Sequence, residues 1–179
     1  MSKLKELTWK NHQKAERTEH ARKLLKGMSP EEYHRYLYNQ YVQYAALESI
    51  ANTKGVLTGI EHIARAEHIL NDIKEIETEH GIERKTEDIC PVVGEYVAHV
   101  MGLENADDIL AHIYVRHFGD MYGGQMIAKR NPGSGSMYIF EDVEELKTTV
   151  RAKLNDDMAD EANRCFEFAM QLFEELGDE

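Results

Sequence analysis

Residues 109–130 read ILAHIYVRHFGDMYGGQMIAKR, and this stretch decides the fold class that we expect for the chain. Apolar residues recur at helical spacing on both sides of a glycine-rich segment, residues 119–124. Three of the 12 glycines lie in these six residues. Because an interior glycine destabilises a helix by about 1 kcal/mol relative to alanine, we expect a long, soft helix that is kinked here.

The glycines alternate with polar residues in a way that favours a binding surface. Arg116, Gly119, Asp120 and Gly123 stand at i, i+3, i+4 and i+7, so they share one face if the helix continues. Glycine allows a ligand to approach the backbone closely, and Asp120 would be the polar group beside that ligand. The plain alternative is a helix–turn–helix break without a binding role.

Helical spacing extends through the rest of the chain, which has only 3 prolines. One apolar stripe consists of Met158, Ala162, Cys165, Ala169, Phe173 and Leu176. The helices that we predict span residues 4–26, 30–52, 59–80, 86–102, 105–130, 140–154 and 156–176, with an irregular loop at 131–136. The fold class is therefore all-α, a multi-helix bundle in a single domain over residues 1–179.

The composition excludes several classes of function. The formal net charge of −12 disfavours nucleic acids and anionic membranes as partners. No segment approaches the roughly 20 apolar residues of a membrane span, and neither end resembles a signal peptide or an anchor. We therefore expect a cytoplasmic protein in which Cys90 and Cys165 are reduced, structural thiols.

Two further places have chemistry beyond the helical pattern. His12 precedes Glu16 by one helical turn, so the carboxylate could orient a metal-binding imidazole, although a lone histidine is usually an ordinary residue. Lys147 and Arg151, with Lys153 nearby, form a basic cluster in an acidic chain. Such a cluster could bind ligand carboxylates, or it could simply pair with Glu144 and Glu145 in solvent.

Together these segments resemble the heme oxygenase family. The resemblance rests on residues 4–8 with His12 and 15–16, on residues 111–120 with 123–125, on 146–151 and on 171–176. The segments occur in the family's order over nearly the whole chain. Residues 50–105 match only in helical pattern. The length is about that of a bare catalytic domain of this family.

The resemblance implies that heme b lies between a proximal helix and the kinked, glycine-rich distal helix. His12 would be the axial iron ligand, next to Glu16. Contacts to the heme propionates and their surroundings would come from Lys5, Tyr114, Lys147 and Arg151. On the distal side the family assigns catalysis to Asp120, which holds a water network for proton delivery, together with Arg116, Gly119, Gly123 and Gly124.

The implied reaction is oxidative cleavage of heme to biliverdin, with the IX-alpha isomer as the family default, carbon monoxide and ferrous iron. The match is best with the soluble cyanobacterial and cyanophage type, which implies ferredoxin as electron donor and a downstream bilin reductase. Two residues depart from the family pattern. Trp9 replaces a lysine that helps to hold a propionate, and Tyr122 replaces a small serine in the distal pocket.

Three alternatives remain open from the sequence. A di-iron carboxylate bundle could use Glu31/His34 and Glu77/His80, but these residues fall at predicted helix ends. A non-catalytic heme-binding protein of the same fold would need His12 but not Asp120. A thiaminase-like enzyme would need an activated cysteine, for which Cys90 and Cys165 are poor candidates.

Overall fold

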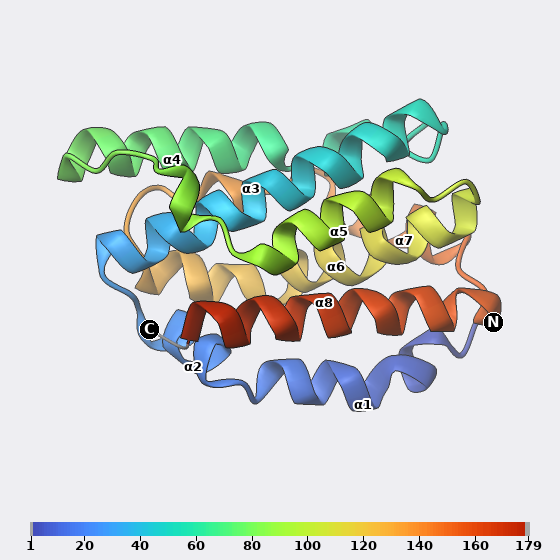
Figure 1. Cartoon of the computed structure of the whole chain (residues 1–179). Helices are drawn as coiled ribbons and strands as arrows, with labels where there is room; N and C mark the ends of the chain where they lie inside the picture. Colours follow the sequence, from blue (N-terminus) through green and yellow to red (C-terminus); the bar gives the residue numbers. More distant parts are fainter. Residues whose placement is uncertain (1, 178–179) are drawn as a thin grey trace.

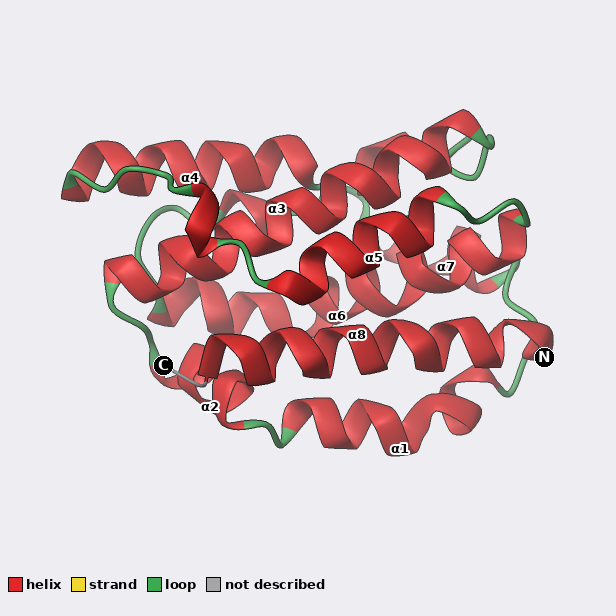
Figure 2. Ribbon diagram, viewed as in Figure 1, coloured by secondary structure: helices red, strands yellow, loops and turns green. Residues whose placement is uncertain are grey.

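A computed structural model describes residues 2–177 and shows only helices and loops within that range (Figures 1 and 2). Its eight α-helices are α1 (Leu4–Glu16), α2 (Glu19–Lys26), α3 (Pro30–Thr53), α4 (Ala66–His80), α5 (Pro91–Met101), α6 (Ala106–Arg130), α7 (Val143–Arg151) and α8 (Ala159–Gly177). Short 3-10 helices lie at Glu61–Ile63, Thr86–Asp88, Ser136–Tyr138 and Asp156–Met158. The predicted all-α class is confirmed.

The helices pack around two hydrophobic clusters. The larger cluster lies among α3, α5, α6, α7 and α8, and the smaller one among α2, α3, α4 and the loop at Tyr138. α3 runs through the molecule and contacts α4, α5 and α6 (Figure 1). α8, near the end of the chain, packs against both α1 and α6. The last helix therefore joins the first helix to the glycine-rich helix.

The segment predicted as one helix over 4–26 is two helices, because a side chain caps the second. The backbone of Thr18 is extended, and its hydroxyl accepts a hydrogen bond from the Ala21 N–H at 3.2 Å. This cap satisfies one of the N–H groups that a helix start leaves without a partner. The prediction of a continuous helix through Thr18 was therefore wrong.

A carboxylate from a different helix sets the start of α4. Glu48 of α3 accepts hydrogen bonds from the N–H groups of Arg65 at 2.6 Å and Ala66 at 2.9 Å. α4 therefore begins at Ala66, whereas the sequence pattern predicted a helix from residue 59. The predictions 86–102, 140–154 and 156–176 also began three to five residues before α5, α7 and α8, whereas 30–52 and 105–130 match α3 and α6 to within one residue.

The apolar stripe predicted on the last helix is only partly interior. Met158, Ala162 and Cys165 are buried, but the later members of the stripe are half-buried. Phe168 and Leu172 are buried instead, because α8 has α1 and α6 as neighbours on two sides. Cys90 and Cys165 are buried and form no disulfide. None of the helices within residues 2–177 is both long enough and apolar enough to cross a bilayer.

α6 runs unbroken through its glycines, so the helix–turn–helix alternative was wrong. The glycines face different surroundings. A Cβ on Gly119 or Gly123 would meet nothing within 4 Å, whereas a Cβ on Gly124 would lie 2.2 Å from a ring carbon of Tyr138. Gly124 therefore allows the loop at Tyr138 to pack against α6, while the other two glycines leave space beside the helix.

This difference predicts opposite effects of alanine in the protein without ligand. Gly124→Ala should lower the free energy of unfolding by about 2 kcal/mol, because the new methyl group overlaps the buried ring of Tyr138. Gly119→Ala is the matched control. It should lower the free energy of unfolding by less than Gly124→Ala does, or raise it by up to about 1 kcal/mol, since alanine favours the helix. Urea denaturation of both variants measures the difference. Equal destabilisation would contradict the packing role of Gly124.

Candidate active site

The buried face of α6 is polar and is held by α3. The Tyr44 hydroxyl donates a 2.6 Å hydrogen bond to the Asp120 carboxylate. The Arg116 guanidinium donates to the amide oxygen of Gln43 at 2.9 Å and, through Nε, to the Tyr96 hydroxyl at 3.0 Å. Arg116 and Asp120, which the sequence put on the glycine face, therefore direct their side chains into the interior.

Asp120 sits in an environment that is unusual for a carboxylate. Burial raises its pKa to about 6, although the charge of His117 and the hydrogen bond from Tyr44 both lower it. The positive charges of Arg116 and Arg65 lower it further. The carboxyl group can therefore gain or lose a proton close to neutral pH, which is what a group in proton delivery requires. Tyr44 was missed in the sequence as a site residue, although it lies on the buried face of α3.

The surface of α6 that borders this buried face is open along the glycines. Gly119 and Gly123 are exposed, and so are Tyr122 and Met126 on the same side. A side chain at either glycine would project into the space beside the helix. This surface fits a flat, apolar ligand that lies against the backbone, with Asp120 buried behind it. Gly124, which was grouped with these glycines, belongs to the packing against Tyr138 instead.

His12 lies on α1 with its side chain 40% exposed. Its Nε2 atom is 2.6 Å from Oε1 of Glu16, and its ring lies 5.3 Å from the ring of Trp9 and 5.7 Å from that of Phe166 on α8. The structure thus pairs His12 with Glu16, as the spacing predicted. Lys5 is exposed on the same helix, next to Trp9 in a shallow hollow.

The basic pair on α7, Lys147 and Arg151, contacts an aromatic side chain of α6, that of Tyr122. The Lys147 ammonium lies 4.0 Å from the centre of the Tyr122 ring, and the Arg151 guanidinium donates to the Tyr122 hydroxyl. Lys147 also pairs with Glu144 at 3.7 Å, whereas no ion pair to Glu145 is present within residues 2–177. Tyr114 lies on the same side of α6, with its ring 5.0 Å from that of Phe118.

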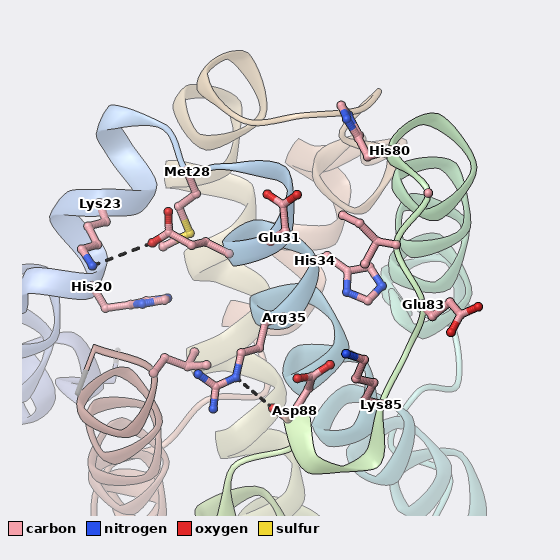
Figure 3. A pocket seen from close by; sticks show the side chains of 14 residues that line it. His20, Lys23, Met28, Glu31, His34, Arg35, His80, Glu83, Lys85 and Asp88 are labelled. Atoms are coloured by element: carbon pink, nitrogen blue, oxygen red, sulfur yellow. Dashed lines mark hydrogen bonds and ion pairs between the residues drawn. The ribbon is translucent and has the colours of Figure 1, made fainter. Parts of the chain in front are cut away.

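A second hollow, of about 690 Å³, lies away from these residues, among α2, α3 and the chain after α4 (Figure 3). Charged side chains of both signs surround it, including Lys23, Arg35, Glu31 and Lys85. His20 lies at its edge. The pKa of this imidazole is lowered to about 4, mainly by burial and to a smaller extent by the positive charge of Lys23. The heme-site residues that the resemblance implies do not line this hollow, whereas Glu31, His34 and His80 of the di-iron alternative do.

The two Glu-x-x-His spacings of the di-iron alternative do not assemble into a metal site. His34 Nε2 contacts Glu77 at 3.0 Å, but the Arg84 guanidinium also binds that carboxylate oxygen at 2.8 Å. His80 lies at the end of α4 and pairs with Glu79. Within the described residues, the ligand atoms that do converge are those of His99, His112 and Glu161.

Comparison with known proteins agrees with the resemblance in the sequence. The chain is 29% identical to "Heme oxygenase 2" of Macaca fascicularis, over 97% of this chain and 64% of that protein. It is 30% identical to "Heme oxygenase 1" of Synechocystis, over 98% of this chain and 83% of that protein. The fold matches the crystal structure of heme oxygenase-1 from Synechocystis in complex with heme, with a TM-score of 0.80 at 24% identity, over 98% of this chain and 90% of that one. Since the family model for heme oxygenase also matches residues 1–175, the chain belongs to the heme oxygenase family.

Proposed function

We propose that residues 1–179 form one heme oxygenase domain, which binds heme b between α1 and α6 and cleaves it, with dioxygen and external electrons, to biliverdin, carbon monoxide and ferrous iron. The observation that carries this proposal is the open face of α6 at Gly119 and Gly123, backed by the buried carboxyl of Asp120. When bound, heme supplies the iron that activates dioxygen and is itself the molecule that is oxidised. The protein supplies position, hydrogen bonds and protons.

On the proximal side, His12 holds the iron and Glu16 holds His12. The carboxylate of Glu16 already binds one imidazole nitrogen. Because that nitrogen is Nε2, iron binding through Nε2 would require a change of the His12 rotamer that turns Nδ1 to Glu16. A carboxylate partner of this kind fixes the orientation of a metal-binding histidine and makes it a stronger ligand.

At the edge of the heme, Lys147 and Arg151 bind the propionates, with Lys5 and Tyr114 as further contacts. Both cations contact Tyr122 in the structure: Lys147 lies over its ring and Arg151 donates to its hydroxyl. Tyr122 thus holds the two cations close together in the absence of a ligand. Tyr122 therefore takes a positioning role that a serine could not. By fixing the propionates, the pair would set which edge of the heme faces Asp120, and we propose the IX-alpha isomer because it is the family default.

On the distal side, Asp120 holds and passes protons, and Gly119 and Gly123 give the substrate room beside the backbone. Arg116 would not touch the substrate, because it is buried and binds Gln43 and Tyr96. Its charge and the Tyr44 hydrogen bond keep the pKa of Asp120 from rising further. We therefore class Arg116 as a positioning residue.

For the electron donor we propose an acidic ferredoxin, and for the product a bilin reductase in bilin biosynthesis. The chain as a whole, at −12, repels an acidic donor. We therefore propose that the donor docks at basic residues, namely Lys5, Arg151 and Lys153, which are exposed, with Lys147 beside them in the sequence. An interaction of this type weakens strongly with added salt.

Replacing His12 tests the axial ligand. His12→Ala should weaken hemin binding by roughly 10–100-fold and change the Soret band, because the iron loses its protein ligand. His80→Ala, which removes an exposed histidine at the end of α4, is the control and should leave both unchanged. Hemin titration followed by absorption measures the effect. An unchanged spectrum in His12→Ala would exclude this ligand assignment.

Asp120→Asn separates catalysis from binding. We expect hemin affinity within about threefold of wild type and a turnover to biliverdin lowered by about 100-fold, the usual contribution of a proton-transfer group. The wild-type rate should change around pH 6, where the Asp120 carboxyl titrates, and Asp120→Asn should lose this inflection. Tyr44→Phe should move it to higher pH, since the lost hydrogen bond had lowered the pKa of Asp120. Full biliverdin yield in Asp120→Asn would favour a proton source other than this carboxyl.

The basic pair on α7 is tested through affinity and product isomer together. Lys147→Ala and Arg151→Ala should each weaken hemin binding by about tenfold, the loss of one charge-assisted contact. Tyr122→Ser should change the biliverdin isomer ratio, because the two cations lose their common support. Lys74→Ala, an exposed lysine on α4, serves as the control. Chromatography of the products reads the isomers, and an unaltered affinity and isomer ratio in all three variants would contradict the proposed role of the pair.

A further inference from the structure

Three side chains from three helices meet away from the glycine face. Glu161, in the first turn of α8, places its Oε1 atom 2.9 Å from Nε2 of His112 on α6, and the same oxygen contacts Nε2 of His99 on α5. All three ligand atoms lie within 4.8 Å of one another. The ligand atoms around a tetrahedral zinc ion are about 3.3 Å apart, given bonds of about 2.0–2.1 Å. Small side-chain rotations would therefore admit an ion.

The orientation of the His112 ring is fixed by a contact on the side away from Glu161. Its Nδ1 atom lies 2.8 Å from the Tyr96 hydroxyl, which also accepts a hydrogen bond from Arg116 at 3.0 Å. In the structure Nε2 of His112 donates to the Glu161 carboxylate. An incoming ion would have to displace that proton, and the Nδ1–H that the Tyr96 oxygen can accept would then leave the lone pair at Nε2. Metal-binding histidines commonly have their second nitrogen held in this way.

A second carboxyl group lies close to the cluster. Asp108 precedes His112 by four residues on α6, so the two share a helix face. The converging ligand atoms are those of His99, His112 and Glu161, and Asp108 adds a second negative charge one helical turn from His112.

Solvent reaches this cluster from one side. The side chains of His99 and Glu161 are 27% and 19% exposed, whereas that of His112 is fully buried. His112 precedes Gly119 by seven residues, about 10 Å along the helix axis. An ion could therefore enter the cluster without passing the glycine face of α6.

We propose that His99, His112 and Glu161 form a binding site for one divalent transition-metal ion of the zinc type, separate from the heme site. Imidazole with carboxylate suits zinc and its neighbours in the first transition series better than magnesium or calcium, which prefer oxygen ligands alone. The ion would link α5, α6 and α8. Because it binds the folded chain and not the unfolded one, it would stabilise the fold in proportion to its concentration.

The test titrates Zn²⁺ into the full-length, heme-free chain, with native mass spectrometry for stoichiometry and thermal unfolding for stability. The measurement is made in a His12→Ala background as well as in the wild type, because the exposed His12–Glu16 pair could also bind zinc. We expect one zinc ion per chain in the His12→Ala protein and a rise in Tm with zinc concentration. His99→Ala in the same background should weaken the affinity by about 100-fold and remove the Tm shift.

Two further variants make the outcome decisive. Glu161→Gln should behave as His99→Ala does, and His80→Ala is the matched control that keeps the site. His99 is partly exposed, so His99→Ala is expected to fold, and its circular dichroism spectrum checks this. The proposal is wrong if His99→Ala binds zinc as tightly as the His12→Ala protein from which it is made. It is also wrong if the His12→Ala protein does not bind one zinc ion per chain. Glu161 would then only accept hydrogen bonds from the two histidines.

Discussion

The arrangement of this molecule depends on the polar contact between α3 and α6. Along this contact Tyr44 binds Asp120, Gln43 binds Arg116, and Glu48 lies 2.7 Å from His117. Buried charges of this kind must be paired, since removal of one partner costs about 3–5 kcal/mol. The contact therefore fixes the rotation of α6 about its own axis. Once these side chains point inward, Gly119 and Gly123 face outward, where a ligand can reach the backbone.

Glu48 extends the same constraint to a third helix. Its carboxylate accepts hydrogen bonds from the N–H groups of Arg65 and Ala66 at the start of α4, in addition to contacting His117. One carboxylate thus joins α3, α4 and α6. Burial by itself would raise the pKa of Glu48, yet the hydrogen bond and charge of His117 and the two backbone N–H groups hold it below its usual value. The glycine face is therefore supported from inside by residues that never touch a ligand.

Most of the fold could be predicted because helix signals are local. α3 and α6 were predicted to within one residue, and in the structure α3 begins with a capping box at Ser29 followed by Pro30. The break at Thr18 was missed although a threonine is a common helix cap, since the apolar spacing continues across it. The start of α4 could not be found locally, because Glu48, which caps it, is 17 residues away in the sequence.

The sequence by itself determined two local relations: the pairing of His12 with Glu16 on α1 and the spacing of Lys147 and Arg151 by one turn of α7. Only the tertiary structure decided how the glycines divide, because Gly124 packs against Tyr138 from a loop that no local pattern connects to α6. It also decided the partner of Asp120 and the role of Tyr122, which holds both cations of α7. The reason is physical: hydrogen bonds and packing within a helix follow a fixed period, whereas contacts between helices depend on how each one rotates and where it crosses its neighbours.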